Sequence, residues 1–237
     1  GRLPAPEVIR DEIASVILTS ARDRGNLAGR HVLVTAGPTR EMIDPVRFVS
    51  NRSSGKMGYA IARAALDRGA RVSLVSGPTS LDPPPGADTV QVVSAAEMRE
   101  AVTARSDADI VIMAAAVADY TPTEQSPQKI KKSDNTLTDE TRALPLTRTV
   151  DILAELGSKK RRGQILVGFA LETENEIEYG KRKLREKNLD LVVVNNPARD
   201  GSAFGGDTNE VTLVDAAGDE QPMPLLSKAR VADVILD

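Results

Sequence analysis

The sequence predicts an α/β fold, namely a doubly wound, Rossmann-like and mainly parallel sheet with a long flap and a C-terminal β-hairpin. Two observations carry this prediction. Short β-rich runs alternate with segments of helical spacing along most of the 237 residues. The β-rich runs are almost continuously apolar, which indicates strands buried on both faces between two layers of helices. In this class, ligands bind beyond the carboxyl ends of the strands.

The alternation supplies three strand–helix–strand units. In chain order the predicted elements are a strand at 31–36, a helix at 57–68, a strand at 71–76, a strand at 89–93, a helix from 95 to about 105, a strand at 109–114, a strand at 164–171, a helix at 173–187 and a strand at 189–195. Gly69 follows the first helix, as expected for a helix end. Each unit therefore places two parallel strands beside one covering helix.

Three segments depart from this alternation. Residues 2–28 resemble a proline-containing connection with a helix, so we divide the chain into a linker from an upstream domain, 1–29, and one domain, 30–237. Residues 120–148 carry three prolines and form a connection much longer than usual, which predicts a functional flap or hairpin arm. Residues 197–218 contain a glycine-rich turn followed by VTLVDAAG, which predicts an edge hairpin.

Composition excludes several classes of protein. Because the chain has no cysteine and a single histidine, His31, it cannot carry a disulfide framework, a Cys/His zinc site or a Cys–His nucleophile pair. The formal net charge of −3 gives no basic field, so we expect no nucleic-acid partner. No apolar run reaches membrane-spanning length and no signal-peptide core is visible, so we expect a cytoplasmic protein without a membrane partner.

The segment DIVIMAAAVADYTPTEQSPQKIKK has the order of residues that an anionic ligand with a ring needs. An apolar strand ends in small residues, 114–118, against which a ligand can lie, and Asp119 can accept hydrogen bonds. Lys129, Lys131 and Lys132 follow and can meet phosphate or carboxylate charge. Without other information, Asp119 can instead cap the turn at Tyr120, and the lysines can be solvated loop charges.

The first strand–helix connection is a second candidate site. It lacks G-x-G-x-x-G, and a P-loop would need a glycine at Ser50 and a serine or threonine at Met57, so neither fingerprint is present. What remains is the polar run NRSSGK, which leads directly into a helix whose free N–H groups attract anions. A phosphate or carboxylate fits there. The alternative is an ordinary helix cap by one of the two serines with solvated charges around it.

Five motifs, in this order and over nearly the whole chain from His31 onward, resemble those of phosphopantothenate–cysteine ligases. They are TAGPTREMIDPVRFVSNRSSGKMG, AAAVADY, KIKK, VGFALET and KRKLREKN. The segment GRLPAPEVI resembles the junction that follows a flavin-dependent phosphopantothenoylcysteine decarboxylase. The resemblance therefore implies the C-terminal ligase part of a bifunctional protein, with a fused upstream decarboxylase whose flavin is not expected on this chain.

The reaction that the resemblance implies belongs to coenzyme A biosynthesis. The carboxylate of 4′-phosphopantothenate attacks the α-phosphate of CTP with Mg²⁺ as cofactor, which gives an acyl-cytidylate and pyrophosphate. The amine of L-cysteine then displaces CMP. The family includes ATP-dependent members, and the fusion architecture favours CTP. The family is dimeric, so the resemblance also implies a homodimer in which the flap of one subunit contributes to the site of its neighbour.

The resemblance implies two catalytic residues. Asn51 matches the asparagine that contacts the acyl part of substrate and intermediate, and Lys129 matches the lysine associated with acyl-cytidylate formation. The implied nucleotide-binding positions are Met113, Ala114, Ala115, Asp119, Lys129, Val150, Asp151, Ile152, Leu153, Phe169, Lys183 and Lys187. The implied phosphopantothenate-binding positions are Arg47, Asn51, Ser53, Ser54, Gly55, Lys56 and Ala115. No metal ligand is assigned, and Val150 departs from the proline often found there.

Two other classes of function stay open at this point. The doubly wound fold commonly hosts NAD(P)-dependent oxidoreductases, although the dinucleotide fingerprint is missing and only Tyr179 has a lysine, Lys183, at the Tyr-x-x-x-Lys spacing. A non-catalytic nucleotide-binding module would bind CTP without releasing pyrophosphate. Pyrophosphate release that needs both CTP and phosphopantothenate, without a change in NADH absorbance, separates the three.

Overall fold

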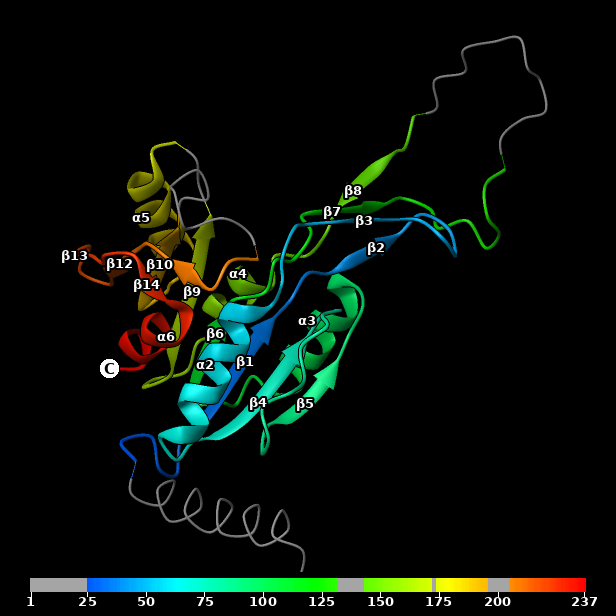
Figure 1. Cartoon of the computed structure of the whole chain (residues 1–237). Coiled ribbons are helices and arrows are strands. Elements are labelled where there is room, and N and C mark those ends of the chain that lie inside the picture. Colours follow the sequence, from blue (N-terminus) through cyan, green and yellow to red (C-terminus); the bar gives the residue numbers. More distant parts are fainter. Residues whose placement is uncertain (1–24, 132–142, 172–173, 196–204) are drawn as a thin grey trace, which may run out of the picture.

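A computed structural model describes residues 25–131, 143–171, 174–195 and 205–237 (Figure 1). Most of the predicted linker 1–29, Lys132 and the predicted start of a helix at Thr173 lie outside the described residues. Within the described end of that predicted linker, Leu27 is buried and its N–H donates to the carbonyl of Arg68 at 3.0 Å. The described chain therefore begins packed against the domain.

An eight-stranded sheet forms the centre of the molecule, in the order β13-β12-β10-β9-β6-β1-β4-β5. Its strands are β1 His31–Ala36, β4 Arg71–Ser76, β5 Asp88–Gln91, β6 Ile110–Met113, β9 Ile165–Leu171, β10 Leu191–Asn195, β12 Val211–Asp215 and β13 Glu220–Pro222. The strands from β10 to β5 are parallel, and β12 and β13 add to the β10 edge in antiparallel fashion. The predicted fold class and the C-terminal hairpin are confirmed.

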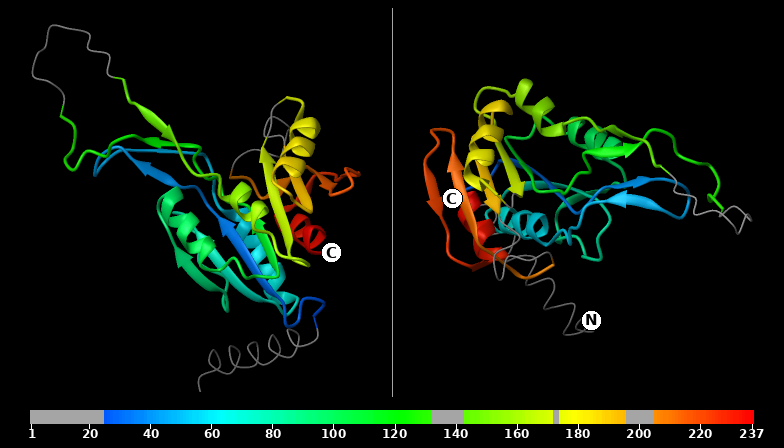
Figure 2. Two further views of the ribbon diagram at one scale, coloured as in Figure 1. Left: turned by 180° about the vertical axis from the view of Figure 1, so that it is seen from behind. Right: turned by 90° about the horizontal axis from the view of Figure 1, so that it is seen from above.

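Helices cover both faces of the sheet (Figure 2). One face packs against α2 Lys56–Asp67 and α6 Lys228–Leu236, and the other packs against α3 Ala95–Thr103, α4 Ile152–Ser158 and α5 Glu176–Glu186. Successive residues of β1 alternate between the layers, since Val32 and Val34 belong to the first cluster and Leu33 to the second. Burial on both faces explains why this strand reads as an unbroken apolar run.

Local sequence explains how closely α2 packs on the sheet. A Cβ atom added to Gly58 would lie 2.7 Å from the carbonyl oxygen of Thr35 and 2.6 Å from the Cβ of Ala36. Only glycine therefore lets the first turn of α2 rest on the carboxyl end of β1. None of the described helices is long and apolar enough to cross a membrane.

Two antiparallel strand pairs extend away from the sheet and form the arm, a name used here for residues 40–50 with the described part of 120–148 (Figure 1). β2 Arg40–Met42 pairs with β3 Phe48–Ser50, and β7 Tyr120–Pro122 pairs with β8 Leu146–Arg148. Of the two predicted forms of this segment, a functional flap or a hairpin arm, the structure shows the hairpin arm. The sequence did not predict the β2–β3 hairpin inside the first connection.

The C-terminal region adds two small features that periodicity had not indicated. β11 Thr208–Asn209 pairs with β14 Leu226–Ser227, and α6 follows directly, capped by the hydroxyl of Ser227. The buried residues of α6 are Val231, Ala232, Ile235 and Leu236. Their spacing is helical, so the helix could have been predicted from the sequence.

Candidate functional site

Two neighbouring cavities lie where the strands end. The first has a volume of about 530 Å³ and the second about 640 Å³. They share five lining residues, namely Ala115, Val117, Asp119, Phe169 and Lys183. A molecule in one cavity can therefore touch a molecule in the other.

The shared wall lies at the point where the chain changes direction in the sheet. After β1 the chain turns towards β4 and β5, whereas β6, β9 and β10 continue on the other side, which is where ligands bind in doubly wound sheets. Hydrogen bonds tie the loops after β1 and β6 together. The N–H of Ala115 donates to Thr35 Oγ1 at 3.1 Å, and the N–H of Ala118 donates to Thr39 Oγ1 at 2.9 Å. The backbone that carries Ala115 and Asp119 is therefore fixed.

The first cavity collects most of the predicted nucleotide-binding residues. Those that line it are Met113, Ala115, Asp119, Val150, Asp151, Ile152, Leu153, Phe169, Lys183 and Lys187. Ala114 lines the second cavity instead, and Lys129 lines neither. Tyr120, Arg148 and Thr149 also line the first cavity but were not predicted. Arg148 and Thr149 directly precede the motif at 150–153, so that motif could have been extended backwards.

The polar groups of the first cavity are held in place by specific contacts. Lys187 Nζ lies 2.7 Å from Asp151 Oδ2, and Lys183 Nζ donates to the carbonyl of Phe169 at 2.6 Å. Asp151 also caps α4, because its Oδ1 accepts from the N–H of Ala154 at 3.0 Å. Partial burial raises the pKa of Asp151, but the hydrogen bonds from Lys187 and Ala154 outweigh it and hold that pKa below its ordinary value. Asp151 is therefore ionised at neutral pH.

Asp119 differs from Asp151 in its surroundings. It is exposed, and its carboxylate makes no hydrogen bond or ion pair with another of the residues described here. It therefore does not cap the turn at Tyr120. A carboxylate on the shared wall of two cavities is free to accept hydrogen bonds from a ligand.

The second cavity is lined by the whole polar run 51–56, together with Met57 and Gly58. Asn51 Nδ2 donates to the carbonyl of Val117 at 2.9 Å, which fixes the amide beside the shared wall. The predicted phosphopantothenate-binding residues that line this cavity are Asn51, Ser53, Ser54, Gly55, Lys56 and Ala115.

Helix α2 begins without a side-chain cap. Its N-cap residue is Gly55, with φ of 78°, and no side chain accepts a hydrogen bond from the first turn. Ser53 Oγ instead accepts from the N–H of Gly55 at 3.2 Å. The alternative of an ordinary serine cap was therefore wrong. The positive end of α2 faces the cavity with nothing of its own to neutralise it.

Several lining residues of the second cavity were not predicted, among them Asn195, Asn209 and Lys228. Asn195 ends β10, and the rule that ligands bind at strand ends could have found it. Asn209 and Lys228 come from the C-terminal region, which no motif or periodicity connected with a site. Only the pairing of β11 with β14 brings them here.

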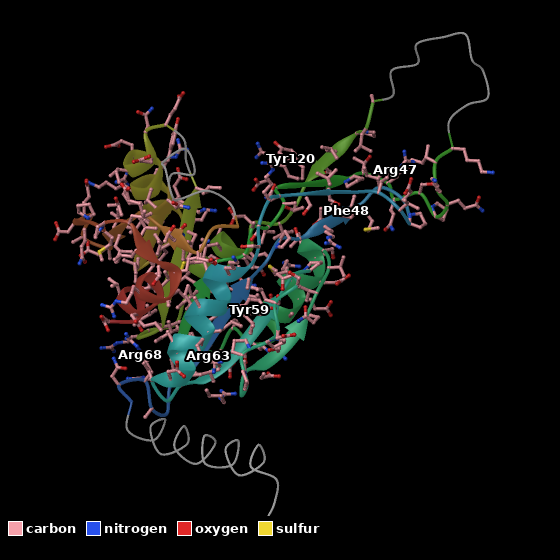
Figure 3. The ribbon with its side chains drawn as sticks, in the orientation of Figure 1. Arg47, Phe48, Tyr59, Arg63, Arg68 and Tyr120 are labelled. Atoms are coloured by element: carbon pink, nitrogen blue, oxygen red, sulfur yellow. The ribbon has the colours of Figure 1, made fainter. Side chains whose placement is uncertain are left out.

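Arg47 and Lys129 are predicted site residues that belong to the arm and line neither cavity. Figure 3 labels Arg47 on the arm. Arg47 Nε donates to Asp44 Oδ2 at 2.9 Å, and its Nη2 donates to the carbonyl of Ile130, at the same distance. The N–H of Ile130 donates to Asp44 at 3.2 Å. Arg47 and the neighbour of Lys129 are therefore parts of one network.

Asp44 is the centre of that network. Its side chain is fully buried, and it also accepts from the N–H groups of Val46 and Arg47 at 2.8 and 2.9 Å. The hydrogen bond from the Arg47 guanidinium, with these N–H groups, holds the pKa of Asp44 far below its ordinary value. The β2–β3 hairpin and the segment that carries Lys129 are thus joined through one ionised carboxylate.

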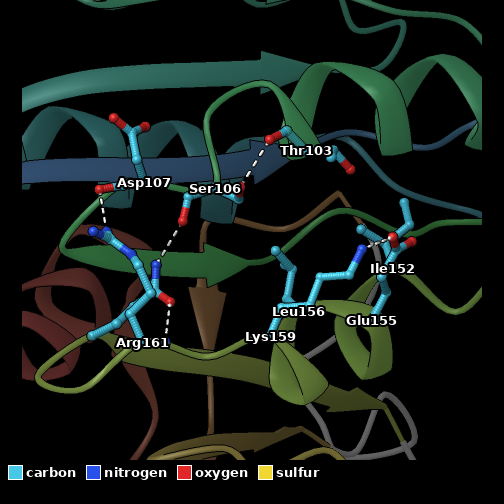
Figure 4. Close-up of a pocket in the computed structure, with 9 residues that line it drawn as sticks. Thr103, Ser106, Asp107, Ile152, Glu155, Leu156, Lys159 and Arg161 are labelled. Carbon is cyan, nitrogen blue, oxygen red and sulfur yellow. Dashed lines mark hydrogen bonds and ion pairs between the residues drawn. The ribbon is translucent and has the colours of Figure 1, made fainter.

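A third, smaller cavity of about 150 Å³ lies between α3 and α4 (Figure 4). Its polar groups pair with one another. Glu155 accepts from Lys159 Nζ at 2.7 Å and from Arg99 Nε at 2.6 Å, and these cations hold its pKa at about 2. Gln164 Nε2 donates to the carbonyls of Ser106 and Ala108. The Glu155 contacts join α3 to α4, and the Gln164 contacts join the loops before β6 and β9, so these polar groups have a structural role.

Within the described residues, no group of three or more His, Cys, Asp or Glu side chains could hold a metal ion. The carboxylates that line the first cavity are Asp119 and Asp151. A magnesium ion that is already coordinated by phosphates needs only one or two protein carboxylates. The cavity therefore fits a metal bound together with a phosphorylated ligand, but offers no cage of its own.

Comparison with known proteins gives a consistent result. A family model described as the DNA/pantothenate metabolism flavoprotein C-terminal domain matches residues 27–237. The coenzyme A biosynthesis bifunctional protein CoaBC of Bacillus subtilis is 55% identical over 212 residues, covering 89% of this chain and 51% of that protein. A cysteine/cysteine sulfinic acid decarboxylase of an unknown prokaryotic organism is 45% identical, covering 100% of this chain and 65% of that protein. The chain thus spans about half to two thirds of the length of these relatives.

A solved structure agrees with the fold. The crystal structure of the C-terminal domain of a coenzyme A biosynthesis bifunctional protein CoaBC has a TM-score of 0.74 and 47% sequence identity. The match covers 89% of this chain and 93% of that domain. The chain therefore has the fold of that domain.

Proposed function

Because this chain belongs to the family of DNA/pantothenate metabolism flavoprotein C-terminal domains, we propose that it is a phosphopantothenate–cysteine ligase of coenzyme A biosynthesis. It joins 4′-phosphopantothenate to L-cysteine at the expense of CTP. One observation carries the proposal above all others. Two cavities share a wall at the strand ends, and most of the residues implied for the nucleotide line one, whereas most of those implied for phosphopantothenate line the other. Two substrates that must react with each other need such a pair of cavities.

In the proposed arrangement, CTP occupies the first cavity. The base lies against Phe169, and the triphosphate lies near Lys183 and Lys187, whose positive charges offset its negative charge. Mg²⁺ enters with the triphosphate and stabilises charge that develops on it. We propose CTP over ATP on the fusion architecture alone. No flavin is proposed for this chain.

Phosphopantothenate occupies the second cavity with its carboxylate at the shared wall, near Asn51 and Ala115. The carboxylate oxygen forms a bond to the α-phosphorus as the bond to the β-phosphate oxygen breaks, so pyrophosphate leaves. The cysteine amine then attacks the acyl carbon, the bond from that carbon to the phosphate oxygen breaks, and CMP leaves as the amine loses a proton. The Asn51 amide donates to the oxygen that gains charge in this second step.

The arm is the part of the chain for which we propose a role in dimerisation. Lys129 and Arg47 line neither cavity, yet the arm exposes large apolar side chains, among them Val46, Phe48 and Leu146. Exposed apolar groups that gather on one extension favour a protein partner. We propose that the partner is a second copy of this chain, and that each arm brings Lys129 to its neighbour's site. The full-length protein also carries the decarboxylase as a fused domain.

The test is turnover of the wild type and of three variants, Asn51→Asp, Lys129→Gln and Lys181→Gln, with CTP and with ATP. Lys181 is the matched control, because it pairs with Glu220 at 2.6 Å and lines neither large cavity. The wild type and the control should release pyrophosphate only when CTP and phosphopantothenate are both present. Asn51→Asp should accumulate acyl-cytidylate, and Lys129→Gln should form none.

Other outcomes would contradict the proposal in distinct ways. CTP binding without pyrophosphate release would favour a non-catalytic module, and a change in NADH absorbance would favour an oxidoreductase. Release of carbon dioxide from cysteine without nucleotide would favour the activity named for the 45% identical relative. Normal turnover in both site variants would remove the assigned roles of Asn51 and Lys129.

A further inference from the structure

Two lysines from different helices meet in the second cavity. Lys56 is the first residue of α2 and Lys228 is the first residue of α6, and both line the cavity. The two helices pack against each other on one face of the sheet, which brings their amino ends together. Lys56 was predicted as a site residue from its motif, whereas Lys228 belongs to no motif.

Oxygen atoms of one short turn, 205–207, bind both lysines. Lys56 Nζ lies 2.7 Å from Asp207 Oδ1 and 2.9 Å from the carbonyl oxygen of Gly205. Lys228 Nζ donates to the carbonyl of Gly206. The turn therefore places a carboxylate oxygen and two carbonyl oxygens around two ammonium groups, much as the oxygens of a phosphate would surround them.

The positive charges of Lys56 and Lys228 are only partly offset by nearby negative charge. The side chain of Asp207 is 87% exposed, so its ion pair with Lys56 contributes little to the stability of the fold. Partial burial and the charge of Lys56 lower the pKa of Lys228, and the single carboxylate of Asp207 opposes this only in part. The uncapped, positive end of α2 adds to the same excess of positive charge.

We propose that Lys228 and Lys56 form a phosphate-binding subsite of the second cavity, in which Asp207 is an internal competitor that a phosphate group displaces. The inference rests on the proposed function only for the identity of the ligand. A doubly charged phosphate satisfies two ammonium groups and a helix end, which one carboxylate does not. The phosphate comes from the phosphomonoester of phosphopantothenate or from the nucleotide, and the experiment distinguishes these sources.

The experiment is an equilibrium titration without cysteine, using 4′-phosphopantothenate, pantothenate and CTP as three separate ligands. The proteins are the wild type, Lys228→Met, Lys228→Arg, Asp207→Asn and the control Lys181→Met. We expect Lys228→Met to raise the Kd of one phosphorylated ligand about tenfold, the effect of one lost charge-assisted contact. Lys228→Arg keeps the charge and should restore most of the affinity. Asp207→Asn should tighten binding several-fold, because it removes the competitor.

The pattern across ligands identifies the phosphate. A change for 4′-phosphopantothenate, with none for pantothenate or CTP, assigns the phosphomonoester; a change for CTP alone assigns the nucleotide. Unchanged affinities for both phosphorylated ligands in Lys228→Met and Asp207→Asn would overturn the inference. If Lys228→Met fails to fold, Asp207→Asn decides, since its side chain is largely exposed. Binding is measured separately from turnover. The binding result can therefore still be interpreted if the turnover experiment contradicts the proposed ligase activity.

Discussion

The central sheet and the arm are built in opposite ways. In the sheet, side chains such as Val34 and Leu74 are fully buried between two layers of helices. In the arm, three-residue strands pair on each side, and Phe48 and Leu146 are each 42% exposed. The order of the arm depends instead on one buried carboxylate, Asp44, and the hydrogen bonds that it accepts.

This difference separates ligand binding from the first chemical step. Both large cavities and most of the implied ligand-binding residues lie at the edge of the sheet, where packing fixes them. Lys129, which is implied for the first chemical step, lies on the arm. If the two regions divide the work in this way, changes in the sheet should affect stability and ligand affinity, and changes in the arm should affect turnover.

The largest expected effect is on stability. Leu74→Ala removes a fully buried side chain from β4 and should lower the free energy of unfolding by about 2–5 kcal/mol. Phe48→Ala, in the arm, removes a half-exposed ring that stacks on Arg40 with 4.7 Å from guanidinium carbon to ring centre, and should cost about 1 kcal/mol or less. Urea unfolding of both variants at one protein concentration checks the difference. Equal losses would mean that the arm is a cooperative part of the core.

The next largest effect should be on turnover. Asp44→Ala leaves the N–H groups of Val46, Arg47 and Ile130 without their acceptor and releases the Arg47 guanidinium. Because Lys129 adjoins Ile130, its position should be lost, and kcat should fall at least about tenfold, an increase of about 1.4 kcal/mol in the barrier. CTP affinity, measured by titration, should stay close to that of the wild type.

Asp82→Ala is a control for this change, since Asp82 is an exposed carboxylate in the loop after β4. It should leave kcat unchanged. The pKa of Asp44 is depressed, so its contribution is fully present above the ordinary carboxyl value of 3.8 and is lost only as the pH falls well below that value. Mild acid should therefore not reproduce the variant. A normal kcat in Asp44→Ala would separate the arm from the chemistry.

The sequence predicted the sheet far better than the arm, for a physical reason. Strands such as 31–36 are buried on both faces, and continuous burial leaves a continuous apolar pattern. The β2–β3 hairpin buries little, so its pairing depends on Asp44, whose partners include Ile130, 86 positions further along the chain. No local pattern records such a contact.

The residues of the candidate site also differ in whether a local sequence pattern could predict them. Residues in contiguous motifs, such as 51–56 and 150–153, were found and lie together around the cavities. Lys228 was not found, because only the pairing of β11 with β14 and the packing of α6 on α2 bring it to Lys56. Motifs therefore identified the site residues that are close together in the sequence. The site residues that only tertiary contacts bring together could not be identified in this way.

The smallest expected effect is on nucleotide affinity. Lys187 lines the first cavity and pairs with Asp151 at 2.7 Å, so a triphosphate must compete with that carboxylate for its charge. Lys187 therefore contributes to CTP affinity only the difference between its contact with the triphosphate and its contact with Asp151. Lys187→Met should raise the Kd of CTP between about threefold and tenfold, which corresponds to a loss of about 0.7–1.4 kcal/mol of binding free energy. Lys181→Met should change it little. Since the arm is unchanged, kcat at saturating CTP should fall less in Lys187→Met than in Asp44→Ala. A larger fall in kcat for Lys187→Met than for Asp44→Ala would contradict the proposed division of roles between the sheet and the arm.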